Sequence, residues 1–184
     1  LAFKETALTT LFIPEGSNLS IGYGIVAGCN KLEKFTGSYL TEDGNILYKD
    51  NLIKGVTNNA FGANGELVID SSWVARNGGI DGYLFYNNKL VKTLDLSSCA
   101  YNLYFKEHAF DGSAIETIKL YGGFSIHLME YALANTANLK SLTDFKLGVF
   151  SNTEYAFSNS AVEIIEITEA NASSPKIAKS MFDG

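Results

Sequence analysis

A large apolar residue returns about every two dozen positions along this chain, and this regularity limits the possible folds more than any other feature. Successive positions lie 23, 35, 24, 25, 23, 24 and 25 residues apart, and in five of the eight cases the preceding residue is Ala. A repeat at one period predicts a solenoid, in which each unit buries its apolar side against its neighbours. We name these residues the beat positions: Phe3, Val26, Phe61, Phe85, Phe110, Leu133, Phe157 and Phe182.

The residues that follow a beat position predict a short strand. After Phe110, the polar turn Asp111-Gly112-Ser113 precedes apolar residues at Ile115, Ile118 and Leu120. This spacing of three and then two is the L-x-x-L-x-L pattern of a leucine-rich repeat, in which alternate strand residues point inward. The same trio recurs at Leu8, Leu11 and Ile13, at Val91, Leu94 and Leu96, and at Val162, Ile165 and Ile167.

A second apolar series lies five residues before most beat positions. Its members face the core from the wall opposite the strands, so each coil sends side chains inward from two sides. We expect the large rings to stack in one buried column. The second series comprises Ile21, Val56, Ile80, Phe105, Leu128 and Ile177, with Asn152 as the exception.

One segment breaks the period by about twelve residues. It contains two β-prone runs, Ile46-Leu47-Tyr48 and Leu52-Ile53, separated by turn residues, and this arrangement predicts a β-hairpin inserted near residues 37–55. The next repeat is also unusual, because its strand region offers only Leu67 and Ile69 as apolar residues.

These observations predict one mostly β leucine-rich-repeat solenoid over residues 1–184, with about seven repeats of 23–25 residues. Parallel strands should stack on one face, with irregular or short helical turns on the other. Both ends fall within the repeat pattern rather than on polar capping units, so we expect a fragment of a longer array.

The chain resembles the BspA-like (Treponema pallidum-type) leucine-rich repeats. The segment Leu8-Thr9-Thr10-Leu11-Phe12-Ile13-Pro14 followed by Ile21-Gly22 is similar to their L-x-x-L-x-L-P…I-G signature, and Glu107-His108-Ala109-Phe110 and Glu154-Tyr155-Ala156-Phe157 resemble its A-F portion. Asp43-Gly44-Asn45-Ile46-Leu47-Tyr48 is similar to the hairpin that interrupts such arrays. The resemblance implies an extracellular or cell-surface bacterial protein that binds host proteins, other bacteria or glycans, and it implies no catalytic residues.

Composition excludes several classes of partner. The net charge is −6, and no cluster of Lys or Arg is longer than two residues, which argues against nucleic acid and anionic membranes. No run of 18 apolar residues is present, so we expect no membrane insertion. Cys29 and Cys99 lie almost three repeats apart, on the order of 14 Å along a stack of coils, too far for a disulfide.

Three sequence features suggest a specific chemical function, but each has a simpler structural explanation. Gly22, Gly24 and Gly28 resemble a dinucleotide-binding loop, but their spacing is one residue longer than that motif requires. Glu116 and Glu163 could form a catalytic carboxylate pair, but they alternate with Lys92 and Lys140 and are better explained as cross-strand ion pairs. His108 aligns with Tyr83, Tyr131 and Tyr155, which predicts a ladder of stacked rings. Since neither histidine has further ligands at a suitable spacing, we expect no metal site.

The strand face remains as the candidate partner-binding face. Phe12 and Val68 are apolar where a strand should face solvent, and such groups on a solenoid face favour a partner site. We therefore expect a non-enzymatic module without cofactors that binds a protein ligand on a host or bacterial surface. A glycan-binding accessory module and a purely structural stalk are the alternatives. The outward middle positions of this face are Phe12, Thr36, Val68, Asp95, Lys119, Thr143 and Glu166.

Overall fold

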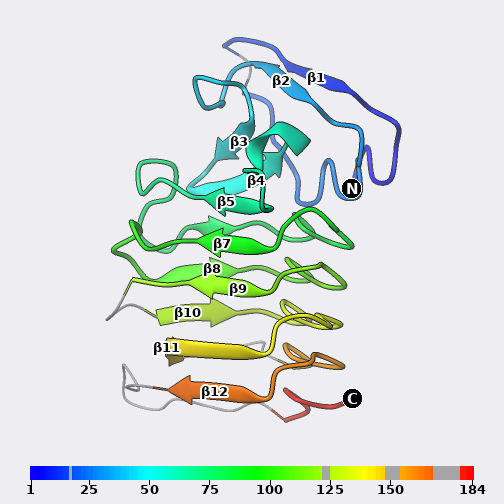
Figure 1. The fold of residues 1–184 in the computed structure, drawn as a ribbon. Coiled ribbons are helices and arrows are strands. Elements are labelled where there is room, and N and C mark those ends of the chain that lie inside the picture. Colours follow the sequence, from blue (N-terminus) through cyan, green and yellow to red (C-terminus); the bar gives the residue numbers. More distant parts are fainter. Residues whose placement is uncertain (17, 122–124, 148–153, 168–178) are drawn as a thin grey trace.

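The computed structural model describes residues 1–16, 18–121, 125–147, 154–167 and 179–184. Within them the chain forms a β-solenoid, and its only helix is the single 3-10 turn η1, Asn58–Ala60. Figure 1 shows coils stacked one below another from the N-terminal to the C-terminal end. The prediction of a mostly β leucine-rich-repeat solenoid is confirmed.

The strands form two walls. The strand face consists of a parallel pair, β1 (Thr10–Ile13) and β2 (Lys34–Gly37), and a parallel three-stranded sheet, β5 (Glu66–Val68), β7 (Thr93–Asp95) and β9 (Thr117–Lys119). The second wall was predicted to consist of irregular or short helical turns, but it contains strands too. Its sheet has the order β12-β11-β10-β8-β6-β4-β3. These strands are β3 (Ile46–Lys49), β4 (Leu52–Val56), β6 (Gly79–Ile80), β8 (Leu103–Phe105), β10 (Ser125–Leu128), β11 (Ser141–Leu147) and β12 (Ile164–Ile167).

Strand β11 connects the two walls. Its residues Ser141 and Leu142 pair with β12, whereas Lys146 and Leu147 pair with β10 of the second wall. The pairing between β11 and β12 shifts register after Leu142. The first residues of β11 and β12 therefore continue the strand face.

The residues between β2 and β6 form an antiparallel pair in which β3 lies beside β4. Strand β4 also pairs in parallel with β6, so one arm of this hairpin belongs to the second wall of the solenoid. Leu47 of β3 is fully buried. The inserted residues are thus packed into the fold and separate β2 from β5, which do not pair.

Four consecutive beat positions, Phe85, Phe110, Leu133 and Phe157, are carried by a third side of the coils, which we name the turn stack: residues 81–88, 106–113, 129–136 and 154–160. The backbone N–H of each of these four residues donates to the carbonyl of the residue before the next beat. These bonds run from Phe85 to Ala109, from Phe110 to Ala132, from Leu133 to Ala156 and from Phe157 to Met181, at 2.8–2.9 Å. Small residues precede the beat because coils approach closely here, and Ala109, Ala132 and Ala156 are fully buried.

The predicted column of buried rings is present over the middle of the array. Phe85 and Phe110 are fully buried, and their ring centroids are 4.8 Å apart. Phe61 is only partly buried and meets Phe85 edge-on, and Phe182 is half exposed with its ring stacked on Phe157. Val26 belongs to a separate N-terminal core with Phe35 and Leu47, so the column is not continuous through all eight positions.

The four ring residues two positions before the beats, Tyr83, His108, Tyr131 and Tyr155, form the predicted ladder. Their centroids are separated by 4.6, 4.8 and 5.1 Å. All four have a left-handed backbone with φ between 54° and 59°, so their side chains leave the coils in one direction and can stack. Tyr23 extends the ladder by stacking on Tyr83 at 5.9 Å. We name these five residues the ring row.

Both cysteines are free and buried, in agreement with the prediction that they form no disulfide. The Cys29 thiol donates to the Phe3 carbonyl at 2.9 Å, and Cys99 lies 3.5 Å from the Ile69 carbonyl. Burial is the main cause that raises the pKa of Cys99. Because a raised pKa disfavours the thiolate, Cys99 is an unreactive core residue.

Candidate partner-binding site

The seven predicted face residues lie on the strand face, in three sets of paired strands. Val68, Asp95 and Lys119 are side by side, because β5, β7 and β9 pair in that register. Phe12 and Thr36 face each other across β1 and β2. Thr143 on β11 and Glu166 on β12 are both exposed and lie at the shifted register. One continuous row of seven residues is therefore not formed, since the hairpin interrupts the face after β2.

The two apolar members of this set project into solvent. Phe12 is 63% exposed and Val68 is 55% exposed. They belong to different sheets, however, so they do not form one patch.

Gly37 of β2 is a glycine at a position where the repeat pattern predicts an apolar side chain. Its φ is +103°, and a Cβ atom there would lie 1.7 Å from the Ile13 carbonyl oxygen. The close approach of β1 and β2 therefore requires glycine.

Several charged side chains of the strand face are paired with one another. Lys119 Nζ lies 2.6 Å from Glu66 Oε1 and 3.4 Å from Asp95 Oδ2. The predicted cross-strand pairs are also present, with Lys92 3.5 Å from Glu116 and Lys140 3.8 Å from Glu163. Such exposed pairs contribute little stability, but each of these four carboxylates has a lysine beside it.

We expect Asp95 to titrate below its ordinary pKa of 3.8. Partial burial raises its pKa, but hydrogen bonds from Ser97 and the interaction with Lys119 outweigh burial and lower it. A lowered pKa stabilises the fold above the ordinary value, and this contribution disappears as pH falls through the folded-state pKa. Carboxyl NMR titration should show the Asp95 pKa rising in Ser97→Ala and staying unchanged in Ser160→Ala. An unchanged pKa in Ser97→Ala would contradict this explanation.

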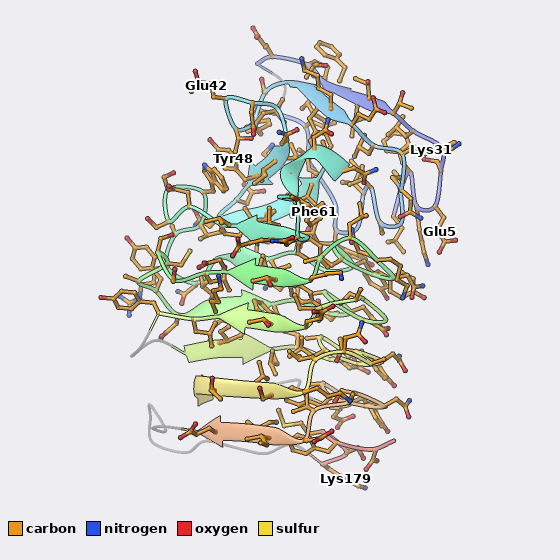
Figure 2. All side chains as sticks on the ribbon, viewed as in Figure 1. Glu5, Lys31, Glu42, Tyr48, Phe61 and Lys179 are labelled. Atoms are coloured by element: carbon orange, nitrogen blue, oxygen red, sulfur yellow. The ribbon has the colours of Figure 1, made fainter. Side chains whose placement is uncertain are left out.

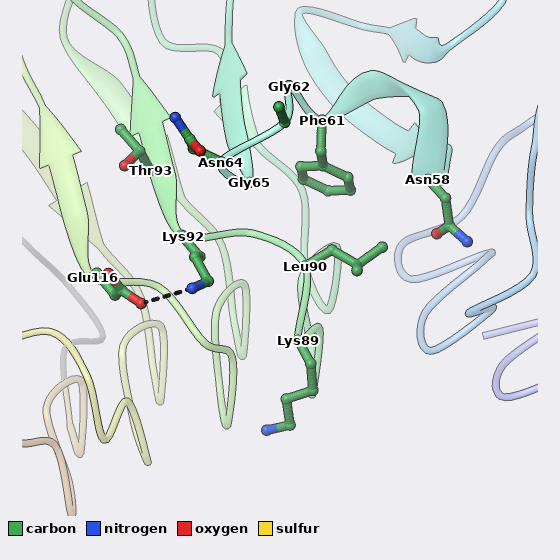
Figure 3. Close-up of a pocket in the computed structure, with 11 residues that line it drawn as sticks. Asn58, Phe61, Gly62, Asn64, Gly65, Lys89, Leu90, Lys92, Thr93 and Glu116 are labelled. Atoms are coloured by element: carbon green, nitrogen blue, oxygen red, sulfur yellow. Dashed lines mark ion pairs between the residues drawn. The ribbon is translucent and has the colours of Figure 1, made fainter.

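An open hollow of the described surface adjoins the strand face (Figure 3). It arises from the short repeat after Phe61. Glu66 comes five positions after Phe61, whereas its register partner Thr93 comes eight positions after Phe85. In addition, Asn64 occupies the position at which the next repeat buries Val91, three residues before the aligned pair Leu67 and Leu94. Three missing residues and one missing aliphatic side chain leave the space unfilled.

We name this space of about 650 Å³ the corner hollow. It lies where the turn stack meets the first residues of β5 and β7. Figure 3 shows Phe61 and Leu90 on its apolar side and Lys92 directed at Glu116 on its polar side. The lining residues are Asn58, Phe61, Gly62, Ala63, Asn64, Gly65, Lys89, Leu90, Lys92, Thr93 and Glu116.

Four polar side chains of the corner hollow already have partners within the protein. Asn58 donates to the Asn30 carbonyl at 2.7 Å, Lys89 donates to the Gly112 carbonyl, and Lys92 pairs with Glu116. This arrangement offers an apolar recess with a polar rim, which suits an anchoring side chain of a partner. Asn64 and Leu90 were not predicted as site residues from the sequence, and the short repeat was the signal that pointed to them.

The alternative chemistries find no support in the geometry. Among the described residues, no group of three or more His, Cys, Asp and Glu side chains could hold a metal ion. Gly24 belongs to a solenoid turn with φ +57°, and a Cβ atom there would lie 2.8 Å from Tyr83 Cβ, so this glycine is explained by packing. No helix of the described residues is both long and apolar enough to cross a membrane.

A solenoid with two strand walls, a paired-charge face and an open recess defines a repeat module with an interaction surface. Solenoids of this class bind through extended surfaces formed by several repeats. The chain belongs to the BspA-type leucine-rich-repeat family: the family model described as BspA type Leucine rich repeat region matches six copies over residues 75–184. Comparisons with curated proteins and with solved structures gave no match.

Proposed function

We propose that this chain is a non-enzymatic binding module of a bacterial cell-surface or secreted protein, and that it binds a protein partner through the strand face. The family supports this proposal, because BspA-type leucine-rich repeats are modules for protein interaction or adhesion. The surface location rests on the family as well.

The corner hollow is the observation on which the binding proposal depends most. It adjoins β5 and β7, next to the row formed by Val68, Asp95 and Lys119. A partner that covers this row can place one apolar side chain against Phe61 and Leu90. Because charges on the surrounding face are paired within the protein, such a partner does not have to neutralise them.

A glycan ligand is the second candidate, and the same hollow favours it through one feature. Phe61 provides a partly buried ring beside two amide side chains, Asn58 and Asn64. A ring with neighbouring amides is a surface on which a sugar can stack and form hydrogen bonds. A structural stalk, in contrast, needs neither group.

The test uses one labelled preparation on an array of extracellular-matrix proteins and on a glycan array. We expect saturable binding to a protein on the first array. Leu90→Glu should weaken that binding by about tenfold or more, because a carboxylate replaces an apolar contact at the rim of the hollow.

Leu19→Glu is the matched control, since Leu90 and Leu19 are 43% and 44% exposed and the substitution is identical. Leu19 lies outside the lining of the hollow and should leave binding unchanged. Saturable binding to glycans alone would replace the protein-binding proposal with the second candidate. Absence of saturable binding on both arrays would support the stalk and overturn both binding proposals.

A further inference from the structure

The turn stack presents a second recess, separate from the corner hollow. It has a volume of about 330 Å³ and is lined by Tyr23, Tyr83, Glu107, His108 and Glu130. We name it the ring hollow, because three of its five lining residues belong to the ring row. Gly82 occupies the position equivalent to Glu107 in the neighbouring coil, so no side chain fills the space between Tyr23 and Glu107.

A column of carboxylates accompanies the ring row. Glu107, Glu130 and Glu154 immediately precede ring residues in three successive coils. Their order along the stack follows from the backbone, because Tyr83, His108 and Tyr131 donate their N–H groups to the carbonyls of Glu107, Glu130 and Glu154 at 3.1, 3.0 and 3.3 Å. Glu107 and Glu154 are exposed, and Glu130 is partly buried.

These three carboxylates differ from four of those on the strand face. No ion pair joins Glu107, Glu130 or Glu154 to a Lys, Arg or His within the described part of the chain. On the strand face, by contrast, Glu66, Asp95, Glu116 and Glu163 all have a lysine within 4 Å. The ring row is therefore bordered by three carboxylates that form no ion pair with a Lys, Arg or His within the described part of the chain.

Two phenols of the ring row, Tyr83 and Tyr131, have a raised pKa. Burial is the largest cause that raises the pKa of Tyr83, and neighbouring charges that include Asp111 and Glu107 raise it further. The pKa of Tyr131 is raised in the same way, first by burial and then by neighbours that include Glu130 and Glu154. Burial is the largest cause of both shifts, and the neighbouring carboxylates add to it because they disfavour a negative phenolate.

We propose that the ring row, together with Glu107, Glu130 and Glu154, binds an extended lysine- or arginine-rich segment of a partner protein. Carboxylates form strong charge-assisted hydrogen bonds with ammonium and guanidinium groups. The alkyl stems of such side chains can lie along ring edges while their charged ends reach the carboxylates. The ring hollow accommodates one of these side chains beside the rings, between Tyr23 and Glu107.

The spacing of the carboxylates suits an extended segment. Coils of a β-solenoid stack at about 4.8 Å, so three carboxylates in successive coils span roughly 10 Å. About three residues of an extended chain cover the same length at 3.3 Å each. A segment with two or three basic residues in close succession therefore matches the column, whereas a neutral glycan would cover the carboxylates without neutralising them.

This surface lies on the turn stack, and its binding does not depend on the proposed function of the strand face. Hexalysine with blocked ends is a suitable probe, used at low salt where charge pairing is least screened. We expect saturable binding that Glu107→Gln/Glu130→Gln/Glu154→Gln weakens by about tenfold or more, because three charges are removed without a change in shape.

The matched control is Glu15→Gln/Glu33→Gln/Glu42→Gln, which removes the same net charge from exposed residues outside the turn stack. Figure 2 shows Glu42 on the side of the molecule away from these turns. We expect the control triple variant to keep its affinity for hexalysine within about twofold. Equal losses in both triple variants would mean binding to overall charge only and would overturn the proposal.

The two histidines give a second readout that needs no substitution. His108 belongs to the ring row, whereas His127 lies on β10 of the second wall, stacked on Tyr104. Hexalysine should shift the imidazole NMR signal of His108 and leave that of His127 in place. Equal shifts at both histidines would contradict the proposal, and so would the absence of saturable binding. The proposal would also be contradicted if a neutral glycan shifted the His108 signal and kept its affinity in the triple Glu→Gln variant. Leu90→Glu should not affect this binding, which separates this test from that of the strand face.

Discussion

Phe110→Ala is expected to lower the free energy of unfolding by about 3–5 kcal/mol, the usual cost of removing a fully buried ring. Phe110 is completely buried, and its centroid lies 4.8 Å from that of Phe85 and 5.0 Å from that of Phe105. The substitution leaves a cavity between coils that their hydrogen-bonded backbones cannot easily close. Urea titration monitored by circular dichroism measures the loss.

Phe12→Ala is the matched control, because it removes the same ring from an exposed position of β1. Its effect should stay within about 0.5 kcal/mol. A similar loss at both positions would show that ring burial in the turn stack does not determine stability, contrary to the fold described above.

Lys54→Met should lower the free energy of unfolding by about 3–5 kcal/mol, because it leaves Asp81 as an unpaired buried charge. Lys54 on β4 and Asp81 after β6 are only 7% and 5% exposed, and Lys54 Nζ lies 3.1 Å from Asp81 Oδ2. This oxygen accepts no hydrogen bond of good geometry from the described residues, so its stabilisation depends on the lysine charge. Asp81→Leu should have a similar effect for the same reason.

The double variant Lys54→Met/Asp81→Leu distinguishes a charge effect from a packing effect. Because it removes both buried charges, it should be more stable than either single variant, as measured in the same urea titration. Lys140→Met serves as a control at an exposed pair, since Lys140 and Glu163 lie 3.8 Å apart with most of their side chains in solvent. Its effect should stay under about 1 kcal/mol. Additive losses in the double variant would contradict the buried-pair explanation.

The regular part of the fold could be predicted because its physical cause is local and repeated. Ala109 and Phe110 recur as a small residue and a large residue in later coils, and each coil needs its neighbour to cover the apolar side. The strand trios follow from alternation of inward and outward residues, and β7, β9 and β12 lie where that alternation places them. The ring ladder from Tyr83 to Tyr155 follows from one ring at the same place in each repeat.

The interruption of the strand face could not be predicted from the repeat pattern. Alignment placed Phe12 and Val68 on one face, but whether β2 pairs with β5 depends on where the inserted residues pack. The inserted strand β3 pairs with β4 and buries Leu47, and the N-terminal coils acquire a separate core. The packing of the inserted residues depends on contacts between positions far apart in the sequence, and the repeat period does not determine these contacts.

The sequence by itself determined that this chain coils, which residues face inward and which family it belongs to, because these properties follow from spacing along the chain. Only the tertiary structure decided which surfaces remain open. The corner hollow exists because coils of unequal length stack beside each other, and the ring hollow exists because Gly82 meets Tyr23 from a coil far away in sequence. Neither space belongs to a single repeat, so neither can be deduced from the repeats one at a time.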